Sequence, residues 1–256
     1  MRPMLTMLAG LFRPARALDA VGAAVRWVWI PLAVLLVVST LIKTGVAAPL
    51  QAGAIQEQAD AVIAKELASM PEEERRAYEE SMAEMEASGD VLVDAGDGGA
   101  MAIVSTAAMI FGAVGAVAAL LYIAGFFFIT AKTQANPVGF TALLTVASLS
   151  LLPHAIRNVV QAIYMGGSGV WIEHAGLGAL VAPADYTQAP GVAYAILSQI
   201  DIWTVWGLAL LFGALLSKSV GFDKKRATSA MLVFVAVTGV AQALPTLVQG
   251  ALMGAM

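Results

Sequence analysis

Two long stretches of the chain carry no charged residue, and they limit it to a membrane-spanning fold. The first runs from Gly98 to Ala131 and the second from Ala227 to Met256. Each exceeds the roughly 20 apolar residues that a helix needs to cross a bilayer. A surface helix of a soluble domain needs only one apolar face, whereas these stretches are apolar on every side. The sequence therefore predicts an all-α, polytopic membrane protein.

The composition points to the same class. Only 12% of the 256 residues are charged and 59% are hydrophobic, with a mean hydropathy of +0.80. Soluble domains carry about 25% charged residues. The chain has no Cys, which excludes disulfide scaffolds, thiolate nucleophiles and Cys-ligated metal sites.

Pro, Gly and charged residues divide the apolar sequence into about five predicted transmembrane helices. Trp27 and Trp29 open the first as interfacial anchors, and Pro153 interrupts the third before a more polar continuation. The predicted spans are residues 28–48, 100–130, 138–165, 192–217 and 229–253. The segments between them are the tail 1–27, a hairpin at 49–99, a loop at 166–191 and a basic loop at 218–228.

The segment 49–99 differs from the rest because it holds most of the 18 acidic residues of the chain. Ile55, Val62 and Ile63 recur at helical spacing. Pro71 followed by three glutamates is typical of a second helix start, since Pro fits the first turn and acids favour the positive end of the helix dipole. We therefore predict an acidic, water-exposed hairpin of two helices.

The distribution of Lys and Arg predicts the orientation in an inner cell membrane. The N-terminal tail is basic, and Lys224, Lys225 and Arg226 lie between the last two spans. Short cytoplasmic segments carry an excess of such residues, so the N-terminus is expected inside, with the hairpin and the C-terminus outside. The same three residues can attract anionic lipid, although topology alone would also require them.

Asp201 is the most notable single residue, since it lies in an otherwise apolar stretch of the predicted fourth span. An intramembrane carboxylate is costly unless it is paired. Arg157, which follows the break at Pro153, is its expected partner. A structural ion pair is the favoured interpretation, and a proton or ligand site is the other.

Two further patterns give weak hypotheses. Gly166-Gly167-Ser168-Gly169 matches the G-x-S-G of rhomboid proteases, but no His follows His174 to act as a base from a later helix. His154, Glu173, His174 and Asp185 could bind zinc, yet none of them has the helical spacing of a ligand pair. We predict no catalytic, cofactor-binding or metal site.

The fourth-span string Ser198-Gln199-Ile200-Asp201-Ile202-Trp203-Thr204-Val205-Trp206 resembles the signature of the Yip family of Ypt/Rab-interacting membrane proteins, in its bacterial branch. Leu11-Phe12-Arg13-Pro14 and Gly139-Phe140 with Leu152-Pro153 resemble two further parts of that family. The resemblance implies five helices with a cytosolic N-terminus. Eukaryotic members bind Rab GTPases through a longer N-terminal region, so the 27-residue tail gives little reason to expect GTPase binding here.

These observations together predict a non-enzymatic membrane scaffold or accessory subunit, associated with an envelope or export complex. The alternative is a small transporter or channel component, and an intramembrane protease is a remote alternative. The expected partners are the lipid bilayer, other membrane or envelope proteins and a second copy of the chain. No cofactor and no nucleic acid are expected.

Overall fold

The computed structural model describes residues 12–21, 25–87, 98–174, 176–182 and 191–253. In this part every regular element is a helix, so the all-α prediction is confirmed. The elements are α2 (Pro14–Val21), α3 (Val25–Ser69), α4 (Glu72–Ala87), α5 (Gly98–Thr133), α6 (Phe140–Ser150), α7 (Leu152–Ser168), the 3-10 helix η2 (Gly176–Leu180), α8 (Val192–Leu197), α9 (Ile202–Leu215) and α10 (Lys224–Met253).

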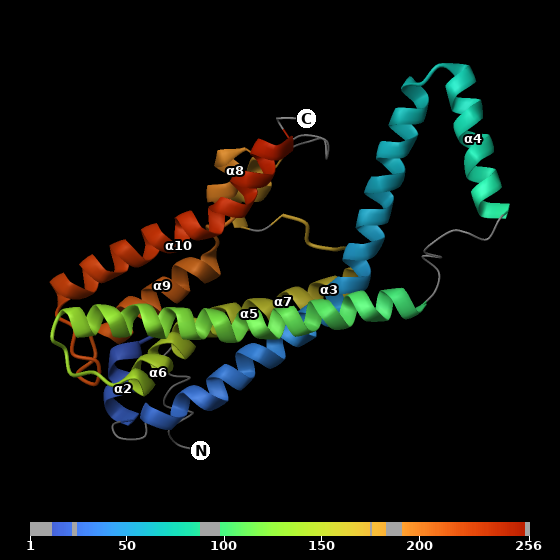
Figure 1. Cartoon of the computed structure of the whole chain (residues 1–256). Coiled ribbons are helices and arrows are strands. Elements are labelled where there is room, and N and C mark those ends of the chain that lie inside the picture. The colour runs from blue at the N-terminus through green and yellow to red at the C-terminus, as the bar shows by residue number, and fades with distance from the viewer. Residues whose placement is uncertain (1–11, 22–24, 88–97, 175, 183–190, 254–256) are drawn as a thin grey trace.

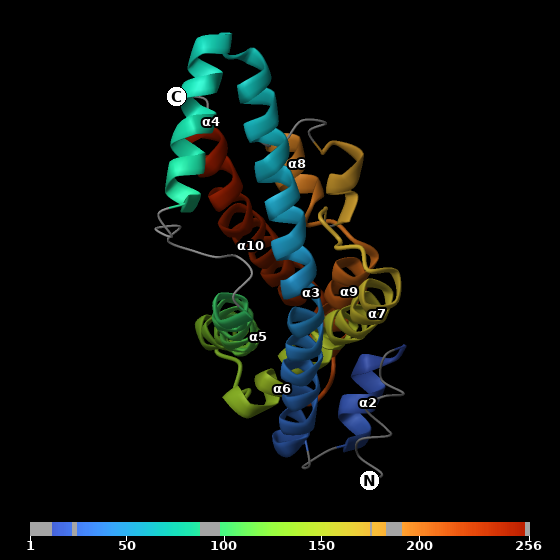
Figure 2. The same cartoon turned by 90° about the vertical axis from the view of Figure 1, so that its right-hand side faces the viewer.

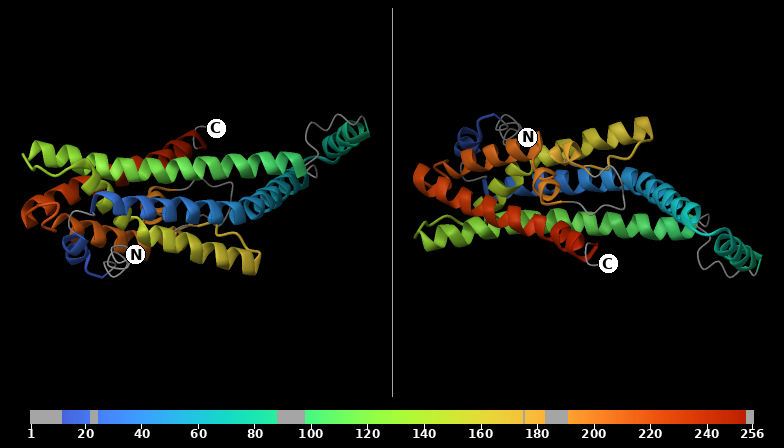
Figure 3. Two further views of the ribbon diagram at one scale, coloured as in Figure 1. Left: turned by 90° about the horizontal axis from the view of Figure 1, so that it is seen from below. Right: turned by 90° about the horizontal axis from the view of Figure 1, so that it is seen from above.

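Four helical segments are long and apolar enough to cross a membrane. They are Trp27–Ser69, Ile103–Thr133, Phe140–Ser168 and Lys224–Pro245. In Figures 1 and 3, α3, α5 and the α6–α7 segment lie side by side, and α10 crosses them at an angle. This arrangement fits a multi-pass membrane protein.

The core of the bundle is built around α6. Every residue from Ala142 to Ser150 on this helix is buried, and α3, α5 and α9 pack around it. Its buried hydroxyl groups stay satisfied within the helix, because Ser148 donates to the carbonyl of Leu144 at 2.8 Å and Ser150 to that of Ala147 at 2.8 Å. Such back-bonding lets polar side chains enter an apolar core.

The turns at one end of the bundle are joined by hydrogen bonds, and we call this the basic end. It consists of α2, the turn 134–139, and the loop 216–223 with the first turn of α10 that follows it. Asn136 is buried and donates its amide to the carbonyl of Val220 at 3.0 Å. Asp19 of α2 accepts a hydrogen bond from the backbone N–H of Ser219 at 3.3 Å. The basic end is therefore an ordered surface in which three separate segments meet.

The predicted boundary between the first span and the hairpin does not coincide with a helix end, because α3 is one helix of 45 residues that continues through Pro49. Pro49 removes only one backbone hydrogen bond and bends the helix rather than ending it. Figure 1 shows α3 changing direction about halfway along. We call residues 49–69 of α3 together with α4 the arm, which stands beyond the bundle in Figures 1 and 2.

The predicted fourth span, 192–217, is not one helix either. It is divided into α8, with 6 residues, and α9, with 14 residues, and Ser198 to Asp201 lie between them. At 1.5 Å per residue α9 is about 21 Å long, which is short of the roughly 30 Å hydrocarbon core. The apolar sequence of this span did not indicate the break, because the break depends on contacts with other segments. These contacts are described below.

Candidate functional site

Asp201 and Arg157 form the ion pair that the sequence predicted. The guanidinium Nη1 of Arg157 lies 2.5 Å from Oδ2 of Asp201, and the two side chains are 25% and 14% exposed. The other carboxylate oxygen of Asp201 accepts a hydrogen bond from the backbone N–H of Thr204 at 2.6 Å. Asp201 is thus the N-cap of α9 and also joins α9 to α7.

The sequence pattern of α7 explains why Arg157 faces the bundle. His154, Arg157, Asn158 and Gln161 recur at helical spacing and share one face. Asn158 donates from this face to the hydroxyl of Thr40 on α3 at 3.1 Å. Among the described residues, His154 Nδ1, Arg157 Nε and Gln161 Oε1 are buried without a hydrogen-bond partner. The ion pair therefore lies in a polar layer between α3, α7 and α9.

This layer lies far from the basic end of the bundle. Asp201 begins α9, about 21 Å from its end at the basic end of the bundle. Arg157 lies about 26 Å from the start of α6, and Lys43 lies about 27 Å from the start of α3. Asp201, Arg157 and Lys43 consequently lie at similar distances from the basic end along the bundle, in the half that is far from it.

The loop after α7 holds the break between α8 and α9 in place. The backbone N–H of Leu177 donates to the carbonyl of Ile200 at 2.9 Å. Gly176, with φ of +55°, approaches so closely that a Cβ there would lie 2.6 Å from the same carbonyl oxygen. A Cβ on Gly178 would lie 2.9 Å from Cβ of Ser198. Sequence analysis missed both glycines, although a G-x-G pair in a short loop could have indicated a close backbone approach.

Pro153 and Trp206 have structural roles on α7 and α9, the two helices that the ion pair joins. Pro153 is in the first turn of α7, where its missing N–H breaks no hydrogen bond, and Leu151 separates α6 from α7. The interruption predicted at Pro153 is therefore confirmed. Trp206 stacks on Trp203, with ring centroids 6.1 Å apart, and on Phe12, with centroids 6.2 Å apart. The stretch from Ser198 to Trp206 thus supplies both the cap of α9 and an aromatic contact with Phe12.

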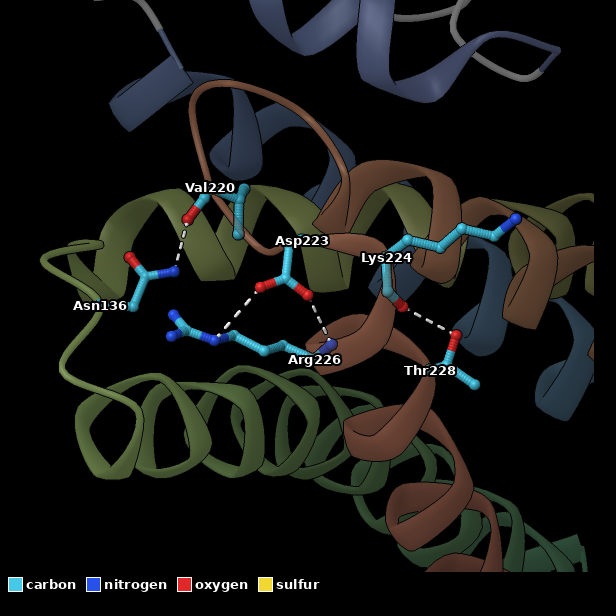
Figure 4. A network of polar contacts seen from close by, with 6 residues as sticks. All are labelled: Asn136, Val220, Asp223, Lys224, Arg226 and Thr228. Atoms are coloured by element: carbon cyan, nitrogen blue, oxygen red, sulfur yellow. Dashed lines mark hydrogen bonds and ion pairs between the residues drawn. The ribbon is translucent and has the colours of Figure 1, made fainter.

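Lys224, Lys225 and Arg226 begin α10 at the basic end, and all three are exposed. Figure 4 shows that Asp223 accepts from the backbone N–H of Arg226 at 2.8 Å and pairs with its guanidinium at 3.3 Å. Asp223 therefore caps α10. Arg226 is partly neutralised, whereas Lys224 and Lys225 have no carboxylate within ion-pair distance in the described chain.

The protease and zinc hypotheses gain no support from the geometry. The hydroxyl of Ser168 accepts from the backbone N–H of Val170 at 3.2 Å, and in the described residues it bonds to neither histidine. His174 lies against Tyr194, with Nδ1 3.3 Å from its hydroxyl. Within the same part of the chain, no three His, Asp or Glu side chains lie close enough together to hold a metal ion. Asp185 lies outside the described residues.

The chain was compared with models of known protein families, with curated proteins and with solved structures, and none of the three comparisons gave a significant match.

Proposed function

We propose that this protein is a non-enzymatic scaffold or accessory subunit of an envelope or export complex, related to the bacterial branch of the Yip family. In this proposal the N-terminus and the basic end face the cytoplasm, and the arm projects from the outer face of an inner membrane. The observation that carries the proposal is the continuity of α3. This single helix is long and apolar enough to cross a membrane and continues into the arm, so in this proposal it connects a partner bound to the arm directly to the bundle.

The arm has the surface of a docking element. None of residues 51–84, all of which the structure describes, is buried. Ile55 is 53% exposed, Ile63 is 42% exposed and Met82 is 47% exposed. Exposed large apolar side chains at helical spacing are typical of a partner interface. The acidic charge of the arm favours a partner with a basic surface and disfavours contact between arms of two copies.

Contacts of the arm among the described residues include one near its base and two ion pairs along α4. The amide of Gln58 donates to the carboxylate of Glu173 at 3.3 Å. On α4, Arg76 pairs with Glu72 at 2.6 Å and Arg75 with Glu79 at 3.8 Å, which supports the helix by i,i+4 contacts. The helices of the arm thus keep their shape while their apolar positions remain available to a partner.

Substituting the apolar positions of the arm should remove its partner without affecting the bundle. We expect Ile55→Glu with Ile63→Glu to abolish co-purification of native membrane or envelope proteins, because each change places a charge in a contact that must exclude water. The control is Gln56→Glu with Ala64→Glu, which adds the same charge at neighbouring exposed positions. Retention of every co-purifying protein by the isoleucine variant would contradict the docking role.

The break between α8 and α9 favours a second candidate, a small transporter or channel component. Discontinuous membrane helices whose half-helix ends face a polar site are typical of transporters. Here the N-terminus of α9 meets the polar layer around Arg157. The scaffold is preferred, because Arg157 and Thr204 already occupy both oxygens of the Asp201 carboxylate.

A further inference from the structure

A hollow of about 370 Å³ opens between α2 and α9 at the basic end. Its lining residues are Arg13, Pro14, Ala15, Arg16, Gly213 and Leu216. The lining combines two guanidinium groups with an apolar wall. This combination matches a ligand that has an anionic head and an apolar body.

The helix α2 is fixed against the bundle and presents its arginines outward. Ala17 and Leu18 are buried, at 5% and 1% exposure. Pro14 meets α9 so closely that a Cβ on Gly213 would lie 2.6 Å from its Cγ. Arg13 and Arg16 are exposed, and they lie on one face because they are three residues apart on a helical turn.

The two arginines are available to an anion. In the described chain neither has a carboxylate within ion-pair distance. The nearest acid in sequence, Asp19, is engaged by the backbone N–H and the hydroxyl of Ser219, at 3.3 and 3.4 Å. Guanidinium groups bind phosphate oxygens through paired, charge-assisted hydrogen bonds.

The apolar side of the hollow continues along α9. Phe12 is 82% exposed and stacks on Trp206, and Trp206 stacks in turn on Trp203. A molecule with its phosphate on the arginines would place its acyl chains beside this aromatic row.

We propose that the hollow between α2 and α9 is a binding site for an anionic phospholipid, with Arg13 and Arg16 holding the phosphate of the headgroup. The attribution of the site to the cytoplasmic leaflet rests on the proposed orientation, whereas the binding itself does not. The site differs from the general attraction of a basic loop, because it combines two arginines with an apolar wall in one shallow, open hollow.

The test is a titration of the full chain in detergent with phosphatidylglycerol or phosphatidylcholine, followed by native mass spectrometry. The first phosphatidylglycerol should bind the parent protein at least about tenfold more tightly than phosphatidylcholine, given the contribution of each nearby Arg. Arg13→Gln with Arg16→Gln should remove about tenfold of this affinity. The control, Lys224→Gln with Lys225→Gln, removes the same charge from residues that do not line the hollow and should change the affinity for the first phosphatidylglycerol less than the arginine variant does.

A second variant tests whether binding depends on the shape of the hollow as well as on its charge. Gly213→Leu keeps both arginines, but its side chain must displace Pro14 and alter the hollow. It should lose the preference for phosphatidylglycerol as the arginine variant does. An unchanged preference in the arginine variant, or equal losses in the arginine and lysine variants, would overturn the proposal. Either result would leave the role of the arm unaffected, because co-purification through the arm is measured separately.

Discussion

Replacing Arg157 with Gln is expected to lower the free energy of unfolding by about 1 to 3 kcal/mol, because the ion pair is partly buried and breaking a fully buried pair costs roughly 3 to 5 kcal/mol. The variant leaves the carboxylate of Asp201, which is only 14% exposed, without its counter-charge. Asp201→Asn should destabilise the protein in a similar way by stranding the guanidinium, although the Asn oxygen can still accept from the N–H of Thr204. Chemical unfolding in detergent measures both effects.

The double variant tests whether the two side chains interact, because side chains that do not interact give additive losses in the free energy of unfolding. If Arg157 and Asp201 interact as the structure shows, Arg157→Gln with Asp201→Asn should lose much less than the sum of the single variants. The matched control is Arg76→Gln on α4, which breaks a pair whose side chains are 72% and 65% exposed and should have little effect. Additive losses would mean that the pair does not hold α7 to α9.

The same variants distinguish the scaffold hypothesis from the transporter hypothesis. A stable protein with Asp201→Asn that has lost its cellular role would favour a functional carboxylate over a structural one. Under the scaffold hypothesis, by contrast, loss of role should follow loss of stability. Second-site changes that restore stability should then restore the role as well.

Adding one methyl group at Gly207 is expected to destabilise the protein by about 1 to 3 kcal/mol, the typical effect of overpacking. A Cβ at this position of α9 would lie 2.7 Å from the carbonyl oxygen of Ser150, at the end of α6. A backbone oxygen cannot rotate away as a side chain can, so the two helices must separate. Thermal unfolding of the Gly207→Ala variant in detergent measures the effect.

Gly115 on α5 provides the matched control for this substitution, because a Cβ there has no atom within 4 Å. Gly115→Ala should stabilise the protein slightly, since Ala is favoured over Gly in a helix by roughly 0.5 to 1 kcal/mol. The same chemical change therefore has opposite signs at the two positions. A Gly207→Ala variant as stable as the parent protein would contradict the close crossing of α6 and α9.

The helical membrane fold and the Arg157–Asp201 pair could be predicted because each depends on local rules. Charge-free apolar runs identify helices that could span a bilayer, and a lone carboxylate in such a run requires a partner. The break at Pro153 followed from its missing N–H. These signals are present in a single segment and need no knowledge of packing.

The break between α8 and α9 could not be predicted, because it is stabilised by a distant loop. Gly176 and Leu177 approach Ile200 only once the chain has folded, and the apolar pattern of 192–217 alone favours one helix. The continuity of α3 through Pro49 was missed for a related reason. Proline lowers the probability of a helix, yet a long helix on both sides tolerates one lost hydrogen bond.

In the proposed topology, α3 crosses the membrane and places the arm on the side opposite the basic end. The chain has no Cys, so a single introduced Cys is a unique label. Ser81 on α4 and Lys218 in the loop after α9 are both exposed. With an impermeant maleimide on intact cells, Ser81→Cys should be labelled, whereas Lys218→Cys should be labelled only after the membranes are opened. Labelling of Lys218→Cys without labelling of Ser81→Cys would invert the topology, and labelling of both on intact cells would contradict the placement of the arm and the basic end on opposite sides.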